Sequence, residues 1–220
     1  MFPIGDDDST RRSVPVVTFA LIAINVLVFL LELRGGDDFI RLWSFVPQRF
    51  SENPVAEAPR LLTAMFMHGG WMHLFGNMLY LWIFGDNVED RFGKVGFLIF
   101  YLLCGVAASF AQYAVSPHMT VPNLGASGAI AGVLGAYILM FPKAMVRVMV
   151  GYNVVALPAI IVLGFWIALQ LFSGVGSIAE TGQTANTGGV AYMAHVGGFV
   201  AGLILAVLFR GRNRGPTLGA

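Results

Sequence analysis

Charged residues are scarce in this sequence. Only 11% of its 220 residues are Asp, Glu, Lys or Arg, while 57% are hydrophobic. A soluble domain of similar size carries about 25% charged residues. Because so few charges cannot cover a surface that faces water, we expect the lipid bilayer to surround most of the chain. The formal net charge of +1 argues against a nucleic-acid partner.

Cysteine and the common metal-binding motifs are scarce too. The one cysteine, Cys104, lies in an apolar run and has no partner in the chain for a disulfide. The sequence has no His-Glu-x2-His stretch, which argues against a zinc protease. It also has no pair of aspartates within its apolar runs, which argues against an aspartyl protease. We therefore expect no metal and no organic cofactor.

What the sequence has in abundance is apolar runs, and a membrane crossing takes about 20 such residues. Six runs lie at residues 14–33, 72–88, 95–115, 127–141, 154–172 and 190–209. They predict an all-α polytopic membrane protein with six transmembrane helices and a long interfacial first loop. We expect a cytoplasmic tail at 1–13, the membrane domain at 14–210 and a second cytoplasmic tail at 211–220. Ser13 is placed to cap the first helix.

The fourth run is short for a membrane crossing. About 15 residues span roughly 22 Å, less than the hydrocarbon core of about 30 Å. Non-helical backbone has to complete the crossing, and it is tolerated only where it is buried in protein or lines a wet cavity. Ser127, at the start of this run, should therefore lie below the membrane surface and near water.

The basic residues predict the orientation. On one side of the predicted membrane lie Arg11, Arg12, Arg91, Lys94, Lys143, Arg147, Arg210, Arg212 and Arg214. The other side has Arg34, Arg41, Arg49 and Arg60, all in the first loop. The positive-inside rule then places both termini in the cytoplasm, and we expect the plasma (inner) membrane. The start of the fourth helix faces outward in this orientation.

Strongly polar residues inside the predicted helices are candidates for function. His73 and Asn77 are four residues apart and share one face of the second helix, Ser127 opens the fourth helix, and His195 lies in the sixth. A serine hydroxyl becomes a nucleophile when an adjacent imidazole accepts its proton. This set therefore favours a Ser127–His195 dyad, with His73, Asn77 and the Ser127 N–H as donors to an oxyanion.

Glycines indicate how the fourth and sixth helices would meet. Both helices have the small-xxx-small spacing that lets backbones approach closely: Gly128 and Gly132 in one, Gly198 and Gly202 in the other. Gly125 comes just before the fourth helix. Taken alone, the stretch around Ser127 favours simple packing. Together with His195 opposite, the glycines favour a contact between imidazole and hydroxyl.

With these motifs the sequence resembles the rhomboid family of intramembrane serine proteases, over nearly all six predicted helices. His68, His73 and Asn77 are similar to its His-x4-His-x3-Asn pattern, and "GASG" is similar to its Gly-x-Ser-Gly. Gly85, Glu89 and Gly93 follow its Gly-x3-Glu-x3-Gly, and "AHVGGFVAG" follows its Ala-His-x2-Gly-x3-Gly.

The resemblance implies an outward-opening, water-filled cavity and cleavage of single-span membrane proteins. In that reading Ser127 is the nucleophile, His195 the general base, and His73 and Asn77 the oxyanion donors. Glu89 and Arg91 would make structural contacts. The sequence departs from the family at Ala131, where some members have a tyrosine that stacks on the histidine, and in the first loop, which has no Trp-Arg pair. Another residue has to hold the His195 ring.

Two other functions remain as alternatives. A catalytically inert, rhomboid-like protein would bind membrane clients, but inert relatives usually lose the serine or the histidine. A small transporter would use the polar cluster as a substrate site, but the sequence shows no internal repeat. The expected partners are transmembrane protein substrates and the bilayer, with the oligomeric state left open.

Overall fold

The structure is a computed structural model that describes residues 2–7, 11–179 and 191–210. Its elements are β1 (Phe2–Gly5), α1 (Val16–Trp43), α2 (Pro47–Glu52), α3 (Pro54–Glu57), α4 (Arg60–Thr63), η1 (Ala64–Phe66), α5 (Trp71–Phe92), α6 (Lys94–Val115), α7 (Ser127–Met140), β2 (Met145–Val150), β3 (Asn153–Pro158), α8 (Ala159–Ala179) and α9 (Tyr192–Arg210). The predicted tail at 211–220, with Arg212 and Arg214, and the predicted start of the sixth helix at Val190 lie outside the described residues.

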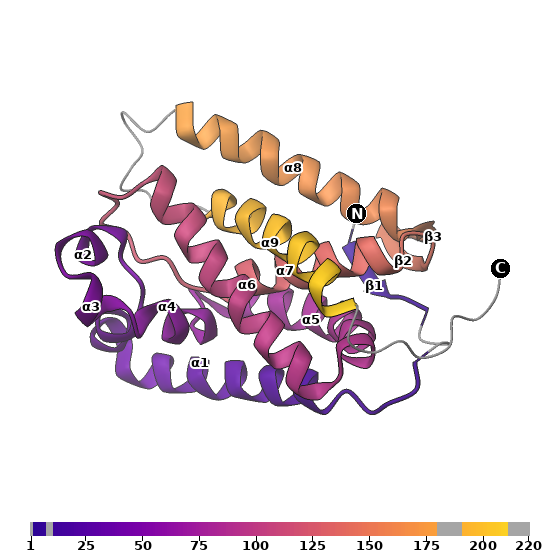
Figure 1. Cartoon of the computed structure of the whole chain (residues 1–220), viewed down its shortest axis with the longest axis horizontal. Helices are drawn as coiled ribbons and strands as arrows, with labels where there is room; N and C mark the ends of the chain where they lie inside the picture. The colour runs from indigo at the N-terminus through magenta and orange to yellow at the C-terminus, as the bar shows by residue number, and fades with distance from the viewer. Residues whose placement is uncertain (1, 8–10, 180–190, 211–220) are drawn as a thin grey trace.

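The long helices confirm the predicted all-α membrane bundle. They are α1, α5, α6, α7, α8 and α9, and Figure 1 shows them as one bundle with the strands at its right end and α2 and α3 at its left. By length and composition α1, α6 and α9 are able to cross a membrane, while α7 and residues 159–175 of α8 are apolar but shorter. The first helix extends past its prediction to Trp43, interrupted at Gly36, where φ is 57°.

α7 is the central helix of the bundle. Every residue from Gly128 to Tyr137 is buried, and α5, α6 and α9 all pack against it. A helix that is apolar on all faces is expected in this position. Its 14 residues span about 21 Å, so the prediction of a short fourth helix that begins at Ser127 is confirmed.

The predicted fifth helix was wrong at its start. It begins at Ala159, and residues 153–158 form β3 instead. β2 and β3 are antiparallel and joined at Gly151, where φ is 60°, and β1 pairs with the other edge of β2. Alternating exposure along β2, with Val146 and Val148 buried, fits a half-buried strand. The N-terminal residues that pair with it lie far away in the sequence.

The predicted cap at Ser13 was also wrong. Residue Pro15 precedes α1, with no side-chain cap of its own, and Ser13 N–H instead donates to Asp90 over 2.8 Å. The carboxylate of Glu89 accepts from Val17 N–H at 3.0 Å and from Thr18 N–H at 2.7 Å. A carboxylate of α5 therefore satisfies the free N–H groups at the start of α1.

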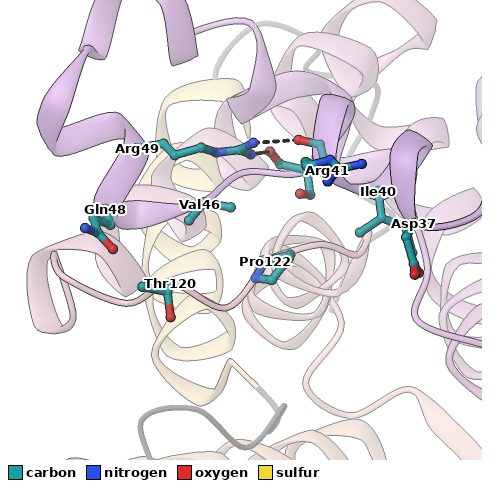
Figure 2. Close-up of a pocket in the computed structure, with 9 residues that line it drawn as sticks. Asp37, Ile40, Arg41, Val46, Gln48, Arg49, Thr120 and Pro122 are labelled. Atoms are coloured by element: carbon teal, nitrogen blue, oxygen red, sulfur yellow. Dashed lines mark hydrogen bonds between the residues drawn. The ribbon is translucent and has the colours of Figure 1, made fainter.

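The first loop is held by the end of α1. The last four carbonyls of a helix have no partner within it, and here all four are taken. Ser44 N–H donates to Ile40 O (3.0 Å), Arg49 Nη1 to Arg41 O (2.5 Å), Arg60 Nε to Leu42 O (2.8 Å) and Thr63 Oγ1 to Trp43 O (2.7 Å). Figure 2 shows Arg49 reaching across to the end of α1. Arg49 and Arg60 thus anchor the loop, which has no Trp-Arg pair.

Candidate active site

Ser127 is the first residue of α7. Its side chain is half-buried, and the preceding residue Ala126 provides no side-chain cap. The N–H groups of the first helical turn have no acceptor within the helix. The hydroxyl and the free N–H of Ser127 therefore lie together at the positive end of a helix dipole.

The imidazole of His195 lies next to this hydroxyl. Its Nε2 is 2.8 Å from Ser127 Oγ, which is hydrogen-bond distance. His195 is in the first turn of α9 and only 8% exposed. The structure therefore brings together the two residues that the sequence analysis selected as nucleophile and base.

Glycines allow this contact, because the backbones of α7 and α9 nearly touch. A Cβ placed on Gly198 would lie 2.0 Å from the carbonyl oxygen of Gly128. One turn further on, a Cβ on Gly202 would lie 2.1 Å from the carbonyl oxygen of Gly132. No real side chain fits at such distances, so only glycine lets the helices pack in this register.

Two residues of α8 cover the opposite side of the His195 ring. The Oε1 of Gln170 is 2.7 Å from His195 Nδ1. The ring centroids of Trp166 and His195 lie 5.8 Å apart, and the angle between the two ring planes is 35°. Ala131 stands at the position where some rhomboid proteases have a stacking tyrosine. It is fully buried in α7 and has no ring to stack on His195.

His73 lies beside Gly125 and Ser127. Its Nδ1 accepts a hydrogen bond from Gly69 N–H at 3.3 Å, so the neutral ring carries its proton on Nε2. A Cβ placed on Gly125, whose φ is 128°, would lie 2.9 Å from this Nε2 and 3.6 Å from Ser127 Oγ. The N–H of His73 therefore faces the backbone that leads into Ser127.

Asn77 lies one turn after His73 on α5. It is 8% exposed, and its Nδ2 is buried without a hydrogen-bond partner among the described residues. A buried donor without a partner costs about 1–3 kcal/mol. Such a group indicates a site that is completed by something else, such as a water or a reacting oxygen.

His68, which the resemblance included, is completely buried between η1 and α5. Burial lowers the pKa of His68 to about 3, so the ring is neutral. Its ring packs at 5.2 Å, edge to face, on that of His73, and its backbone N–H donates to Glu32 Oε2 at 3.0 Å. His68 therefore supports His73 and does not contact Ser127 directly.

The space beside Ser127 is small. A cavity of about 20 Å³ is lined by Ser127, Gly125, Asn123 and neighbouring residues of α6 and α7. That is room for about one water molecule, much less than the water-filled cavity that the resemblance implies. A larger cavity of about 430 Å³ lies elsewhere, between the end of α1, α2 and residues 120–122 (Figure 2), and holds none of the candidate residues.

Among the described residues, no metal-ligand cluster and no carboxylate takes part in this geometry. In residues 2–7, 11–179 and 191–210, no three His, Cys, Asp or Glu side chains are grouped so as to hold a metal ion. His195 contacts Gln170 Oε1 through Nδ1 and Ser127 Oγ through Nε2. The arrangement is that of an imidazole between a hydroxyl and a neutral amide.

Sequence reasoning missed Gln170, Trp166 and Glu32. Gln170 is the strongly polar residue of an apolar helix, and that alone marks it as a candidate. Glu32 is 4% exposed within α1 and carried the same signal. Trp166 gave no signal, because aromatic residues are common in membrane helices.

Comparison with known proteins identifies relatives of this chain. The model of the rhomboid domain matches residues 55–212. The rhomboid protease GluP of Bacillus subtilis (strain 168) is 38% identical over 168 residues, which is 74% of this chain and 32% of that protein. Rhomboid-like protein 11, chloroplastic, of Arabidopsis thaliana is 30% identical over 155 residues, 68% of this chain and 51% of its own length.

A third relative is mitochondrial. Rhomboid protein 1 of Saccharomyces cerevisiae is 29% identical over 195 residues, which is 86% of this chain and 51% of that protein. The chain therefore spans about a third to a half of the length of these curated relatives. The rhomboid-domain match covers well over half of the chain and includes α5 to α9. The chain belongs to the rhomboid family.

Proposed function

We propose that this protein is an intramembrane serine endopeptidase that cleaves single-span membrane proteins in the outer half of the bilayer. The observation that carries the proposal is the 2.8 Å contact between Ser127 Oγ and His195 Nε2. A hydroxyl and an imidazole at this distance are the minimum set for activated nucleophilic attack. The site is formed by α5, α7 and α9, which the rhomboid-domain match includes.

The reaction follows from the contact between Ser127 Oγ and His195 Nε2. His195 Nε2 accepts the hydroxyl proton while Oγ attacks the carbonyl carbon of the substrate peptide bond. The protonated imidazole then gives this proton to the leaving nitrogen, and the C–N bond breaks to leave an acyl-enzyme. Water, deprotonated by His195, hydrolyses the ester and returns Ser127 to its starting state.

The tetrahedral intermediates need donors for their oxyanion. We assign this role to the N–H of Ser127, to Nε2–H of His73 and to the Nδ2 of Asn77. Within the part of the chain that the structure describes, Asn77 Nδ2 has no partner, which supports the assignment. The proton on His73 Nε2, which the hydrogen bond from Gly69 enforces, supports it too. Fixed donors of this kind are usually the largest single contribution to such catalysis.

Orientation and location belong to the same proposal. The basic residues at the end of the molecule that carries β2, Lys143 and Arg147 among them, would lie in the cytoplasm with both termini. We infer the plasma (inner) membrane. Fusing alkaline phosphatase or a fluorescent protein to the C-terminus tests the orientation. Phosphatase activity in this fusion would mean that the C-terminus lies outside the cytoplasm, and it would contradict the proposed orientation.

The function is tested by cleavage with matched controls. Purified protein in proteoliposomes is mixed with a tagged single-span substrate, beside Ser127→Ala and His195→Ala. The controls are Ser116→Ala, at the end of α6, and His118→Ala, an exposed residue of the following loop. We expect cleavage by the wild type and both controls, and none by the two dyad variants.

A second readout identifies the nucleophile directly. A fluorophosphonate that labels serine should mark the wild type and Ser116→Ala but not Ser127→Ala. If the wild type binds the substrate without cutting it, the inert client-binding function takes the place of this proposal. If Ser127→Ala cuts as fast as the wild type, the assignment of the nucleophile is wrong.

A further inference from the structure

The ring of His195 makes a polar contact at each of its two nitrogens. Ser127 Oγ lies 2.8 Å from Nε2, and Gln170 Oε1 lies 2.7 Å from Nδ1. The first contact connects α9 to α7 and the second connects it to α8, at the outer edge of the bundle in Figure 1. The histidine is thus held between two helices.

The side of the Gln170 amide that faces the ring, its oxygen, decides which nitrogen carries the proton. An amide oxygen only accepts hydrogen bonds, so Nδ1 of His195 has to donate. A neutral imidazole has one proton, and Nε2 is then left with a lone pair that faces the hydroxyl of Ser127. In the other tautomer Nε2 would carry a hydrogen and would not accept the serine proton.

We propose that Gln170 is a positioning residue that fixes His195 in its reactive tautomer and orientation. The inference rests on the proposed function for its kinetic part, but the tautomer is a property of the protein alone. In proteases with a triad a carboxylate takes this place. Here a neutral amide does, on a helix that none of the recognised motifs of this chain includes.

Trp166 completes the support from the same helix. It is four residues before Gln170 and therefore on the same face of α8. Its ring lies 35° from the plane of His195, at 5.8 Å between centroids. The amide fixes the ring at Nδ1 and the indole restricts its tilt, which is the support that Ala131 does not give.

The tautomer can be measured without substrate. Nitrogen-15 NMR of protein labelled at histidine distinguishes protonated from unprotonated ring nitrogens, and His195→Ala identifies the His195 signals. We expect Nδ1 protonated and Nε2 unprotonated in the wild type and in Ser127→Ala. In Gln170→Met, which has similar length but no acceptor oxygen, we expect a mixture of tautomers. A wild-type ring protonated at Nε2 overturns the proposal.

Kinetics give the second test, with Gln170→Met, Gln170→Glu and a control, Leu169→Met. Leu169 is the neighbouring residue of α8 and is 46% exposed. We expect Gln170→Met to lower kcat about tenfold to a hundredfold with little change in KM, because a hydrogen bond to a group that becomes charged is lost. The control should cleave like the wild type.

Gln170→Glu separates positioning from packing. It keeps the acceptor, so it should restore most of the activity lost in Gln170→Met. A carboxylate also favours the imidazolium form, so the acid limb of the kcat/KM profile should move to higher pH. Equal kcat in Gln170→Met and the wild type, or no recovery in Gln170→Glu at any pH, overturns the proposal.

The failure of the proposed function would look different. In that case the wild type would not cleave, or Ser127→Ala would cleave and keep its fluorophosphonate label, while the NMR signals would still report the tautomer of His195. If the wild type cleaves and Ser127→Ala does not, the effect of Gln170→Met decides the positioning role by itself.

Discussion

Gly202→Ala tests the glycine contact that brings the two helices of the dyad together. A Cβ at this position would lie 2.1 Å from the carbonyl oxygen of Gly132 and 2.5 Å from its Cα. Ordinary contact begins at 3.4 Å, so α9 has to move away from α7 by about 1.3 Å, the difference of the two distances. Neither backbone atom belongs to a flexible side chain that could yield.

Two effects follow from this displacement. Overpacking of a filled core costs typically 1–3 kcal/mol, so the free energy of unfolding should fall by about this amount. The contact of His195 with Ser127 depends on the same pair of helices, and a misplacement of about 1 Å costs about a hundredfold in rate. Gly202→Ala should therefore be less stable and much less active, although residue 202 is two turns away from His195.

Gly164→Ala is the matched control. Gly164 is also a helical glycine, in α8, but a Cβ there has nothing within 4 Å. Alanine at such a position should stabilise a helix by about 0.5–1 kcal/mol. Reversible unfolding in detergent, together with the cleavage assay, compares the two variants. If Gly202→Ala matches Gly164→Ala in stability and rate, the close contact between α7 and α9 does not hold the dyad together.

Three further substitutions test other parts of the structure. Asn77→Ala should lower kcat by about a hundredfold to a thousandfold, or roughly 3 kcal/mol, by removing one oxyanion donor; a wild-type rate would remove Asn77 from the site. Glu89→Ala removes three hydrogen bonds at the start of α1 and should lower the free energy of unfolding by about 1–3 kcal/mol. Glu52→Ala, at an exposed residue of α2, is its control, and equal melting temperatures would contradict the capping role of Glu89. Gly125→Ala forces a Cβ to 2.8 Å from the His73 ring at a φ of 128°, and should cost about 1–3 kcal/mol in stability together with most of the activity. Gly69→Ala, whose nearest contacts are at 3.9 Å, should remain active, and similar losses in both would show that the crowding at Gly125 is unimportant.

The helices were predictable because the bilayer leaves few alternatives. A run of about 20 apolar residues has to form a helix where no water can satisfy its backbone, and the start of α7 at Ser127 followed from the same reasoning. The strands were not predictable in this way. Residues 154–158 continue the apolar run of α8, and a short apolar run does not distinguish strand from helix.

Contacts between distant residues account for the other errors. Ser13 has the residue type and position of a helix cap. Its N–H donates to Asp90 instead, and the carboxylate of Glu89 accepts from the N–H groups at the start of α1. Nothing in the local sequence reports that the last turns of α5 lie against the first turn of α1. The pairing of Ser127 with His195 was predictable despite their separation in the sequence, because the glycine spacing on both helices indicates that their backbones pack closely.

The low polarity of the bilayer explains why a glutamine, rather than a carboxylate, contacts His195 at Nδ1. A buried ion pair in a membrane protein requires the desolvation of both charges, and charged side chains within the bilayer are costly. A carboxylate at Nδ1 would add a permanent charge to a site that is neutral before the reaction. An amide oxygen fixes the same tautomer without that charge, and it is satisfied by the N–H it accepts. A neutral acceptor on α8 is therefore the arrangement that orients His195 at the smallest cost to the stability of the bundle.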